Sequence, residues 1–328
     1  MNILILSSGT RNKLITYFMK ELKDIGNVVC ADCSNLAPTL YIANKHYIVP
    51  RIDDSEYLKV ILEICRKENI HGVFSLIDPE LSLISKNKGK FTEMGIIPFV
   101  SEFKKVEMCL NKYEFYKFCK KNGFPTVKSY IDINEFKKDY ETGKIDFPVF
   151  IKPVMGSCSI NIQRIDNLVD LESYIKKYSE LIIQEFMDCP EFGVDVYIDM
   201  ISHKTVSIFA KKKILMRAGE TDKAVSYIDE KLFNLIDQFV QTAGFEGPID
   251  IDIFKKDGQY YLSEVNPRFG GGYPLAYECG CNFPRYLLNN LMSKENTPAL
   301  GQYDSDVYMM KYLDLKILKN KREHYGEK

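Results

Sequence analysis

The sequence predicts a chain of the α/β and α+β classes, in which an open parallel sheet covered by helices precedes a β-rich part. Through the first third of the chain, short apolar runs alternate with amphipathic stretches, which is the pattern of βαβ units. After the break at Gly123-Phe124-Pro125, β-rich segments dominate. The length of 328 residues exceeds the roughly 250 to 300 residues at which single cores stop growing, so we expect two or three subdomains with clefts between them.

The apolar runs of the first part are expected to be strands, at residues 3–6, 28–30, 47–49, 73–76 and 96–100. Between two of these runs, Tyr57, Ile61 and Ile64 recur at helical spacing and predict an amphipathic helix. The loop after the first strand contains one glycine, Gly9, whereas a dinucleotide-binding loop needs three. A nicotinamide-dependent oxidoreductase is therefore disfavoured, and Asp32 at the end of the second strand is expected to form a turn.

The second part is predicted to begin with a helix at residues 111–122 and to continue as strands and one long helix. Strands are expected at residues 149–152, 160–165, 181–185, 193–200 and 205–212. Apolar positions from Ile228 to Val240 predict a helix that ends at Gly244, because glycine readily adopts the left-handed conformation found at helix C-termini. Two further strands, at residues 248–254 and 260–265, are expected to form a hairpin around a turn at residues 255–258.

The charge balance and the cysteine content argue against several functional classes, among them nucleic-acid-binding, membrane-bound and zinc-binding proteins. Lys and Arg number 44 against 45 Asp and Glu, so the net charge gives no long-range attraction to nucleic acid or to a membrane surface. The apolar start of the chain is too short for a signal peptide or a membrane span. The nine cysteines show no paired zinc-binding motif, so reduced thiols in a cytoplasmic enzyme are expected.

The predicted hairpin places acidic side chains together. Asp250 and Asp252 share one face of its first strand, and Glu264 and Asn266 share one face of the second, because side chains alternate along a strand. Clustered carboxylates repel one another, and a magnesium ion held by Asp252, Glu264 and Asn266 resolves that conflict. Arg268 then follows where it can meet a phosphate group. A further ligand role for Asp250 stays open, and the alternative is an exposed hairpin with solvated acids.

These residues resemble the ATP-grasp superfamily, and more narrowly its carbamoyl-phosphate-synthase-like carboxylate–amine ligases. The resemblance consists of Asp252 followed by the segment Glu264-Val265-Asn266-Pro267-Arg268-Phe269-Gly270-Gly271-Gly272. It covers nearly the whole chain and implies an ATP-grasp fold. The implied parts are a Rossmann-like domain at residues 1–108, a helical connector at 109–125, a small lid subdomain at 126–187 and a larger subdomain with the metal site at 188–328.

The resemblance also implies roles for individual residues. ATP phosphates are expected to contact Lys112 and Lys152, together with the loop residues Gly156, Ser157 and Ser159. A hinge segment is expected to bind the adenine through Gln184, Glu185, Phe186 and Met187. Glu191 is expected to accept hydrogen bonds from the ribose hydroxyls, and Arg217 to face the transferred phosphate or the substrate carboxylate. Lys152, Arg217 and Arg268 are the residues expected to act in catalysis.

From the residues alone, simpler interpretations stand beside these roles. Lys112 lies in a lysine-rich helix and is also explained as a solvated surface residue, and the run Lys211-Lys212-Lys213 is most simply a solvated face. Lys152 lies within an apolar strand, where a lysine that opens onto a cleft suits phosphate oxygens. The glycines at residues 270–272 are expected to form either an anion-binding nest or a flexible turn.

The expected function is ATP-dependent activation of a small-molecule carboxylate as an acyl phosphate, which an amine then attacks. ATP and Mg²⁺, or Mn²⁺ in its place, are the implied cofactors, and a homodimer is plausible for the family. One rival is a single-unit enzyme that phosphorylates bicarbonate or carbamate, as carbamoyl phosphate synthases do. Another is a protein that binds the nucleotide without turnover. The sequence indicates neither the carboxylate, the amine nor the base that deprotonates the amine.

Overall fold

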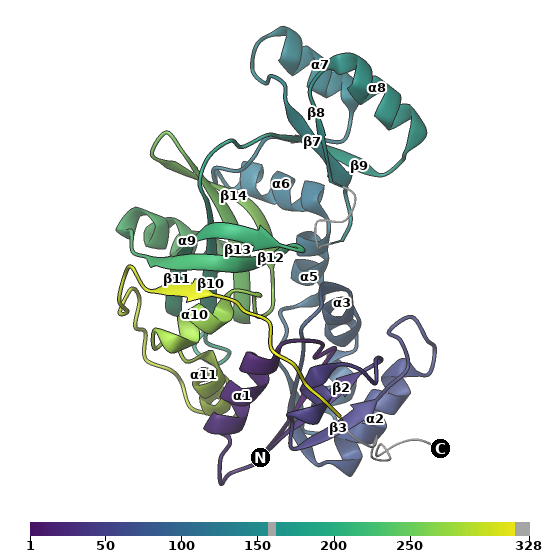
Figure 1. Ribbon diagram of the computed structural model, residues 1–328, viewed down its shortest axis with the longest axis vertical. Coiled ribbons are helices and arrows are strands. Elements are labelled where there is room, and N and C mark those ends of the chain that lie inside the picture. Colours follow the sequence, from purple (N-terminus) through teal and green to yellow (C-terminus); the bar gives the residue numbers. More distant parts are fainter. Residues whose placement is uncertain (157–161, 319–328) are drawn as a thin grey trace.

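The computed structural model describes residues 1–156 and 162–318. Its strands form sheets of five, six and four strands. Figure 1 shows the five-stranded sheet and its helices at the lower end of the molecule, the four-stranded sheet at the upper end and the six-stranded sheet between them. This arrangement confirms the predicted combination of an α/β part and an α+β part.

The N-terminal sheet is parallel throughout and has the order β3-β2-β1-β4-β5. Its strands are β1 (Asn2–Leu6), β2 (Asn27–Asp32), β3 (Lys45–Ile48), β4 (Ile70–Ser75) and β5 (Ile97–Pro98). Helices between and after them are α1 (Asn12–Glu21), η1 (Pro38–Tyr41), α2 (Tyr57–Lys67), α3 (Asp78–Lys86), α4 (Lys88–Thr92) and α5 (Phe103–Leu110). Ile3 and Ile5 belong to one core cluster, and Leu4 and Leu6 to another, so both faces of β1 are buried, as its continuous apolar run predicts.

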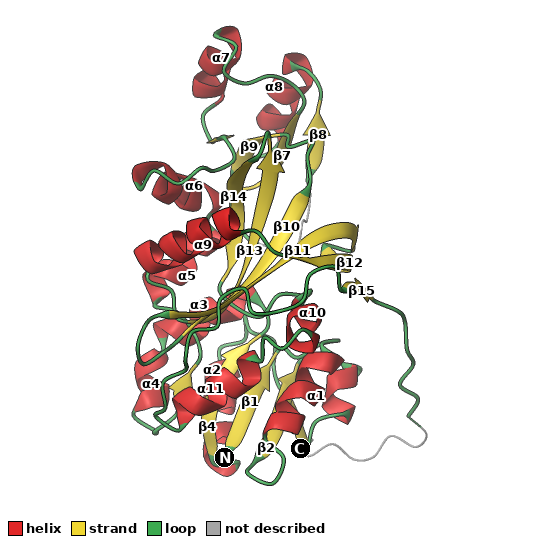
Figure 2. Ribbon diagram, turned by 90° about the vertical axis from the view of Figure 1, so that its left-hand side faces the viewer, coloured by secondary structure: helices red, strands yellow, loops and turns green. Residues whose placement is uncertain are grey.

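The small sheet is antiparallel in the order β6-β9-β7-β8 and forms the lid at the top of Figure 2. Its strands are β6 (Ser129–Tyr130), β7 (Val149–Pro153), β8 (Gln163–Ile165) and β9 (Leu181–Glu185). Helix α6 (Lys112–Lys121) precedes this sheet, and α7 (Ile133–Glu141) and α8 (Leu168–Lys177) lie within it in the sequence. Phe136 and Leu171 from the two helices pack with Ile151 of β7 in one core, which explains why this sheet is covered on one side.

The large sheet is antiparallel in the order β14-β13-β10-β11-β12-β15. Its strands are β10 (Glu191–Ile198), β11 (Thr205–Arg217), β12 (Glu220–Tyr227), β13 (Gly247–Lys256), β14 (Gln259–Asn266) and β15 (Tyr308–Met310). Helix α9 (Glu230–Ala243) ends, as predicted, at Gly244, whose φ of 67° is left-handed. Ile236 and Phe239 of this helix pack on Ile251 of β13, so one face of the sheet is apolar and the other is left for the site.

The last helices join the large sheet to the N-terminal domain. Helices α10 (Tyr273–Glu278) and α11 (Phe283–Leu291) follow β14. Tyr273 and Phe283 share a core cluster with Phe18 of α1 and Phe74 of β4. The N-terminal sheet is thereby fixed against the strand ends that hold the acidic hairpin residues.

Most predicted elements are present, with shifted ends. Strand β11 continues to Arg217 instead of ending at residue 212, because β12 pairs with it along that extension. Helix α9 begins after Asp229, whose side chain accepts a hydrogen bond from the backbone N–H of Lys231, so Ile228 lies before the helix. Among residues 1–156 and 162–318, no helix is both long and apolar enough to cross a membrane. The subdomain boundaries at 108, 125 and 187 stay predictions.

Candidate active site

A cavity of about 670 Å³ lies between the lid and the charged face of the large sheet. Strands of both sheets, the loop after β14 and Arg11 of the N-terminal domain line it. The expected site residues found in its lining are Lys112, Lys152, Gly156, Gln184, Glu185, Met187, Glu191, Asp252, Glu264, Asn266 and Arg268. Residues from three regions far apart in the sequence therefore meet in one place.

The acidic residues of the hairpin converge as predicted. Asp252 is paired in register with Glu264, and Asp250 with Asn266, and all four line the cavity. Burial raises the pKa of Glu264, and the negative charge of Asp252 raises it further. The nearby lysines Lys152 and Lys112 act in the opposite direction. Two carboxylates directly opposite each other on neighbouring strands are mutually destabilising unless a cation lies between them.

The donor set at this position fits a divalent cation with hard oxygen ligands. Asp252 and Glu264 supply carboxylate oxygens and Asn266 an amide oxygen. In the part of the chain that the structure describes, no group of three His, Cys, Asp or Glu side chains is arranged to hold a metal. The set of two carboxylates and one amide suits magnesium, which usually takes one or two protein carboxylates and completes its coordination shell with water and phosphate oxygens.

Two lysines face the acidic residues from the lid side of the cavity. Lys152 on β7 is buried, and its pKa is lowered by burial, an effect that Glu264 and Asp252 oppose. Lys112, at the start of α6, donates a hydrogen bond to the carbonyl oxygen of Gly156, and burial lowers its pKa too. Lys112 is therefore no solvated surface residue, and both lysines line the cavity that also contains Glu264 and Asp252.

Arg268 is held in place from two sides. Its Nη2 atom donates to Asp78 Oδ2 at 2.9 Å and to Asn266 Oδ1 at 3.1 Å, and Nη1 donates to the carbonyl oxygen of Phe269 at 3.1 Å. Asp78 begins helix α3 of the N-terminal domain, and its side chain is only 5% exposed. The guanidinium is thus oriented by the N-terminal domain and by an expected metal ligand at once.

The interpretation of residues 211–213 as a solvated face is wrong for two of the three lysines. Lys211 and Lys213 have side chains only 1% and 5% exposed, whereas Lys212 is exposed. All three lie on β11, where alternate side chains share a face, and carboxylates of β10 and β13 compensate the buried charges. Lys213 Nζ lies 2.7 Å from Glu191 Oε1 and 2.6 Å from Asp252 Oδ1, and the residue lines the cavity.

Lys211 forms a second, deeper charged layer. Its Nζ atom lies 2.5 Å from Asp195 Oδ2 and 3.8 Å from Asp250 Oδ1. Burial raises the pKa of Asp195 to about 6, against the opposing effect of Lys211. A Cβ atom added at Gly270 would come 2.4 Å from Asp250 Cγ, and one at Gly272 would come 2.4 Å from Lys211 Cε. These glycines are therefore required for close packing, and neither has a positive φ.

The opposite end of the cavity is more apolar. Phe150, Ile162, Met187 and Phe254 line it beside the hinge strand β9. Glu185 of the hinge is paired with Lys256 of the large sheet at 3.1 Å, which ties the lid to the β13–β14 hairpin. Apolar side chains with a few polar groups beside them are typical of small-molecule pockets.

Four expected site residues are not found in the lining of the cavity: two lie elsewhere, and two lie outside the described residues. Arg217 is 63% exposed, pairs with Asp222 at 3.3 Å and does not line the cavity. Phe186 does not line the cavity either, and it packs against Phe150, with ring centroids 5.1 Å apart. Ser157 and Ser159 lie outside the described residues.

The structure adds a polar corner in which Arg11 and Lys311, which the sequence did not indicate, meet Glu220. Arg11 of the N-terminal domain forms an ion pair with Glu220 at 2.9 Å, and Lys311 pairs with the same carboxylate at 2.9 Å. A Cβ atom at Gly271 would come 2.9 Å from Arg11 Nη1, so this glycine too lies in close contact. Sequence spacing gives no signal for Arg11, because its partner is two hundred positions away in another domain.

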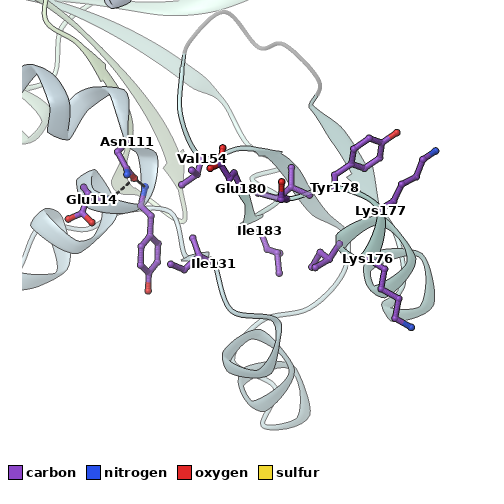
Figure 3. A pocket seen from close by; sticks show the side chains of 13 residues that line it. Asn111, Glu114, Ile131, Val154, Lys176, Lys177, Tyr178, Glu180 and Ile183 are labelled. Carbon is purple, nitrogen blue, oxygen red and sulfur yellow. Dashed lines mark hydrogen bonds between the residues drawn. The ribbon is translucent and has the colours of Figure 1, made fainter. Parts of the chain in front are cut away.

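A second hollow, of about 550 Å³, lies between the start of α6 and the lid (Figure 3). Ile131 and Ile183 lie between Asn111 and Glu114 on one side and Lys176 and Lys177 on the other (Figure 3). None of the expected site residues lines it. The acids and lysines of the first cavity make that cavity the candidate active site.

The fold and the cleft together define an enzyme of the carboxylate–amine ligase class that works with ATP and Mg²⁺. The chain belongs to the ATP-grasp family. The family model "ATP-grasp domain" matches residues 109–272, and the model "PylC-like, N-terminal domain" matches residues 3–99.

Individual relatives support this membership. The chain is similar to a carbamoyl-phosphate synthase of Methanobrevibacter smithii, with 25% identity over 309 residues, 90% of this chain and 81% of the relative. It is 30% identical over 202 residues to the alpha-aminoadipate–LysW ligase LysX of Saccharolobus solfataricus, covering 56% of this chain and 72% of that protein. The biotin carboxylase domain of the Hydrogenobacter thermophilus 2-oxoglutarate carboxylase has the same fold, with a TM-score of 0.76 at 14% identity over 93% of this chain and 73% of that one.

Proposed function

We propose that the protein is an ATP- and Mg²⁺-dependent ligase that activates a small-molecule carboxylate as an acyl phosphate for attack by an amine. The observation that supports this proposal most directly is the cavity in which Lys112 and Lys152 face Asp252 and Glu264. Opposed lysines and carboxylates suit a bound polyphosphate with its cation, because each group compensates the charge of another.

In the proposed reaction, an oxygen of the substrate carboxylate bonds to the γ-phosphorus of ATP while the bond to ADP breaks. Lys112, Lys152 and Arg268 balance the charge on the transferring phosphoryl oxygens. Asp252, Glu264 and Asn266 would hold Mg²⁺, which adds positive charge to the phosphates when bound. The amine then bonds to the acyl carbon, phosphate leaves and the nitrogen loses a proton. Because Asp78 anchors Arg268, the N-terminal domain contributes to the geometry of this step.

The adenosine part of ATP is assigned to the apolar end of the cavity. Gln184, Glu185 and Met187 lie on or directly after the hinge strand and line that end, and Glu191 lies at the beginning of β10 where it can accept hydrogen bonds from a ribose diol. Phe186 supports the hinge from behind by packing on Phe150. Arg217 is assigned to the substrate because its neighbours Met216 and Ala218 line the cavity, although the arginine side chain itself does not.

A second candidate function is phosphorylation of bicarbonate or carbamate. The similarity to a carbamoyl-phosphate synthase over 81% of that relative's length favours it. The chemistry of the cavity is the same in both cases, because bicarbonate also presents a carboxylate-like oxygen to the γ-phosphate. The two candidates differ in the substrate that stimulates ADP formation. With either candidate, we also propose a cytoplasmic location and a homodimer.

The test is ADP release by purified protein with Mg²⁺ and ATP against a panel of amino acids, other carboxylic acids and bicarbonate, each with and without amines. We expect a carboxylate together with an amine to stimulate ADP formation, and Glu264→Gln to lower it by at least ~100-fold. Stimulation by bicarbonate alone would support the second candidate. ATP binding without stimulation by any panel member would favour a nucleotide-binding protein without turnover and contradict the ligase proposal for this panel.

A further inference from the structure

Lys213 lies in the cleft but has no part in the reaction proposed above. Its side chain is 5% exposed, and its Nζ atom contacts Glu191 Oε1 at 2.7 Å and Asp252 Oδ1 at 2.6 Å. Contacts this short with two carboxylates show that the ammonium serves as a cation between two different strands, β10 and β13.

The structure of the sheet gives Lys213 this reach. Gly193 on β10 is paired with Asp252 on β13 on one side and with Lys211 on β11 on the other. A Cβ atom at Gly193 would come 3.3 Å from Cε of Lys213 and 3.0 Å from Cε of Lys211. The absence of a side chain at this position lets Lys213 extend across β10 to the acid of the next strand.

Both partners of Lys213 have another use in the proposed function. Glu191 is assigned to the ribose hydroxyls and Asp252 to the metal. An ammonium at 2.6 Å already occupies one oxygen of Asp252. A divalent cation on the same carboxylate would repel that ammonium, because like charges a few ångströms apart interact strongly inside a protein. Nucleotide binding and the two ion pairs of Lys213 therefore compete for the same oxygens.

We propose that Lys213 is a displaceable internal cation, which holds Glu191 and Asp252 in place until the magnesium nucleotide binds and then turns its ammonium toward the transferring phosphoryl group. The inference rests on the proposed function, which assigns those two acids to the nucleotide and the metal. Lys213 lines the same cavity as Lys152 and Arg268, so a released ammonium stays among the groups that contact phosphate. It is a positioning residue before nucleotide binding and neutralises charge afterwards.

The experiment is a Mg²⁺ titration of ADP binding by isothermal titration calorimetry, with ADP release measured in parallel. It compares the wild type with Lys213→Met and with the control Lys212→Met, whose side chain is exposed on the same strand. Without the competing ammonium, Lys213→Met is expected to reach half-maximal ADP binding at least ~5-fold lower in Mg²⁺, about 1 kcal/mol. Its turnover is nevertheless expected to fall by at least ~10-fold. Lys212→Met should match the wild type in both measurements.

A Lys213→Met variant that needs as much Mg²⁺ as the wild type, or more, overturns the proposal. Should this variant fail to fold, Lys213→Arg keeps the charge and provides the same test. Its guanidinium can hold carboxylates with two parallel hydrogen bonds, so it is expected to raise the Mg²⁺ requirement, and an unchanged requirement contradicts the competition. A wild type that binds no magnesium–ADP would contradict the proposed function itself, which is a different outcome from any of these.

Discussion

Replacement of Gly272 by alanine tests the tight packing beneath the cleft. The new Cβ atom would lie 2.4 Å from Lys211 Cε, whereas carbon atoms in contact are normally about 3.5–4.0 Å apart. Lys211 must therefore move by about 1 Å or more, yet its side chain is 1% exposed and its Nζ atom lies 2.5 Å from Asp195 Oδ2. Overpacking costs about 1–3 kcal/mol and breaking a buried ion pair about 3–5 kcal/mol. We expect Gly272→Ala to lower the free energy of unfolding by about 2–4 kcal/mol.

Urea denaturation followed by circular dichroism measures this loss. The φ of Gly272 is −92°, which alanine adopts readily, so backbone strain does not contribute. The matched control is Gly89→Ala, because Gly89 lies in α4 with nothing within 4 Å of the new Cβ atom, and it should be neutral or slightly stabilising. In a Lys211→Ala background the cost of Gly272→Ala should shrink by at least about 1.5 kcal/mol. A cost below about 1 kcal/mol in the wild type, or an equal cost in both backgrounds, would refute the reasoning.

Three further predictions concern other charged groups. Arg217→Ala should change the free energy of unfolding by less than about 1 kcal/mol, since the Arg217 side chain is 63% exposed although its partner Asp222 is buried, but should lower ADP formation by about tenfold if the arginine reaches the substrate during turnover; an unchanged rate contradicts its assignment. Burial alone would raise the pKa of Asp199, but hydrogen bonds from amide and backbone groups lower it to about 2 from 3.8. A carboxyl group whose pKa is lower in the folded than in the unfolded state stabilises the fold at pH values above its unfolded-state pKa, so Asp199→Asn should be less stable than the wild type near pH 7. Urea denaturation should show this difference in stability shrinking as the pH falls from about 4 toward 2. A difference that stays constant with pH argues against this role of Asp199. Asp78→Asn should lower the free energy of unfolding by about 1–3 kcal/mol in urea denaturation and should slow ADP formation, because Arg268 Nη2 loses the carboxylate that lies 2.9 Å away. Full activity of this variant would show that the ion pair is dispensable.

The sequence predicts the features of this fold that depend on local patterns. The strands of the N-terminal sheet and the register of Asp252 against Glu264 follow from apolar runs, side-chain alternation and a short turn. The site at the end of that hairpin was predictable for the same reason. The parts that were not predictable depend on contacts between distant segments, which periodicity does not report.

The buried lysines illustrate this limit. Alternation along β11 does place Lys211 and Lys213 on one face, so a shared orientation was available from the sequence. Their burial depends on Asp195 of β10 and Asp252 of β13, which become neighbours only through the strand order of the sheet. Charge pattern alone therefore favoured a solvated face, and only the three-dimensional pairing compensates the cost of burying the two charges.

The glycines that follow Arg268 were ambiguous for a similar reason. A run of glycine predicts either conformational freedom or close approach, and the sequence does not distinguish them. The structure shows close approach, to Asp250 at Gly270 and to Lys211 at Gly272. Arg11 and its partner Glu220 lie in different domains, so no spacing rule could have joined them.

The central claim is that the cavity between the lid and the large sheet binds the magnesium nucleotide through its buried lysines. The most direct measurement is isothermal titration calorimetry of magnesium–ADP binding to the wild type, to Lys152→Met and to Lys121→Met, an exposed lysine of α6 that serves as the control. The account predicts that the wild type and Lys121→Met bind alike and that Lys152→Met binds at least ~10-fold more weakly, because a charge-assisted hydrogen bond is worth about 1.5–3 kcal/mol. Equal binding by Lys152→Met, or no binding by the wild type, would contradict it.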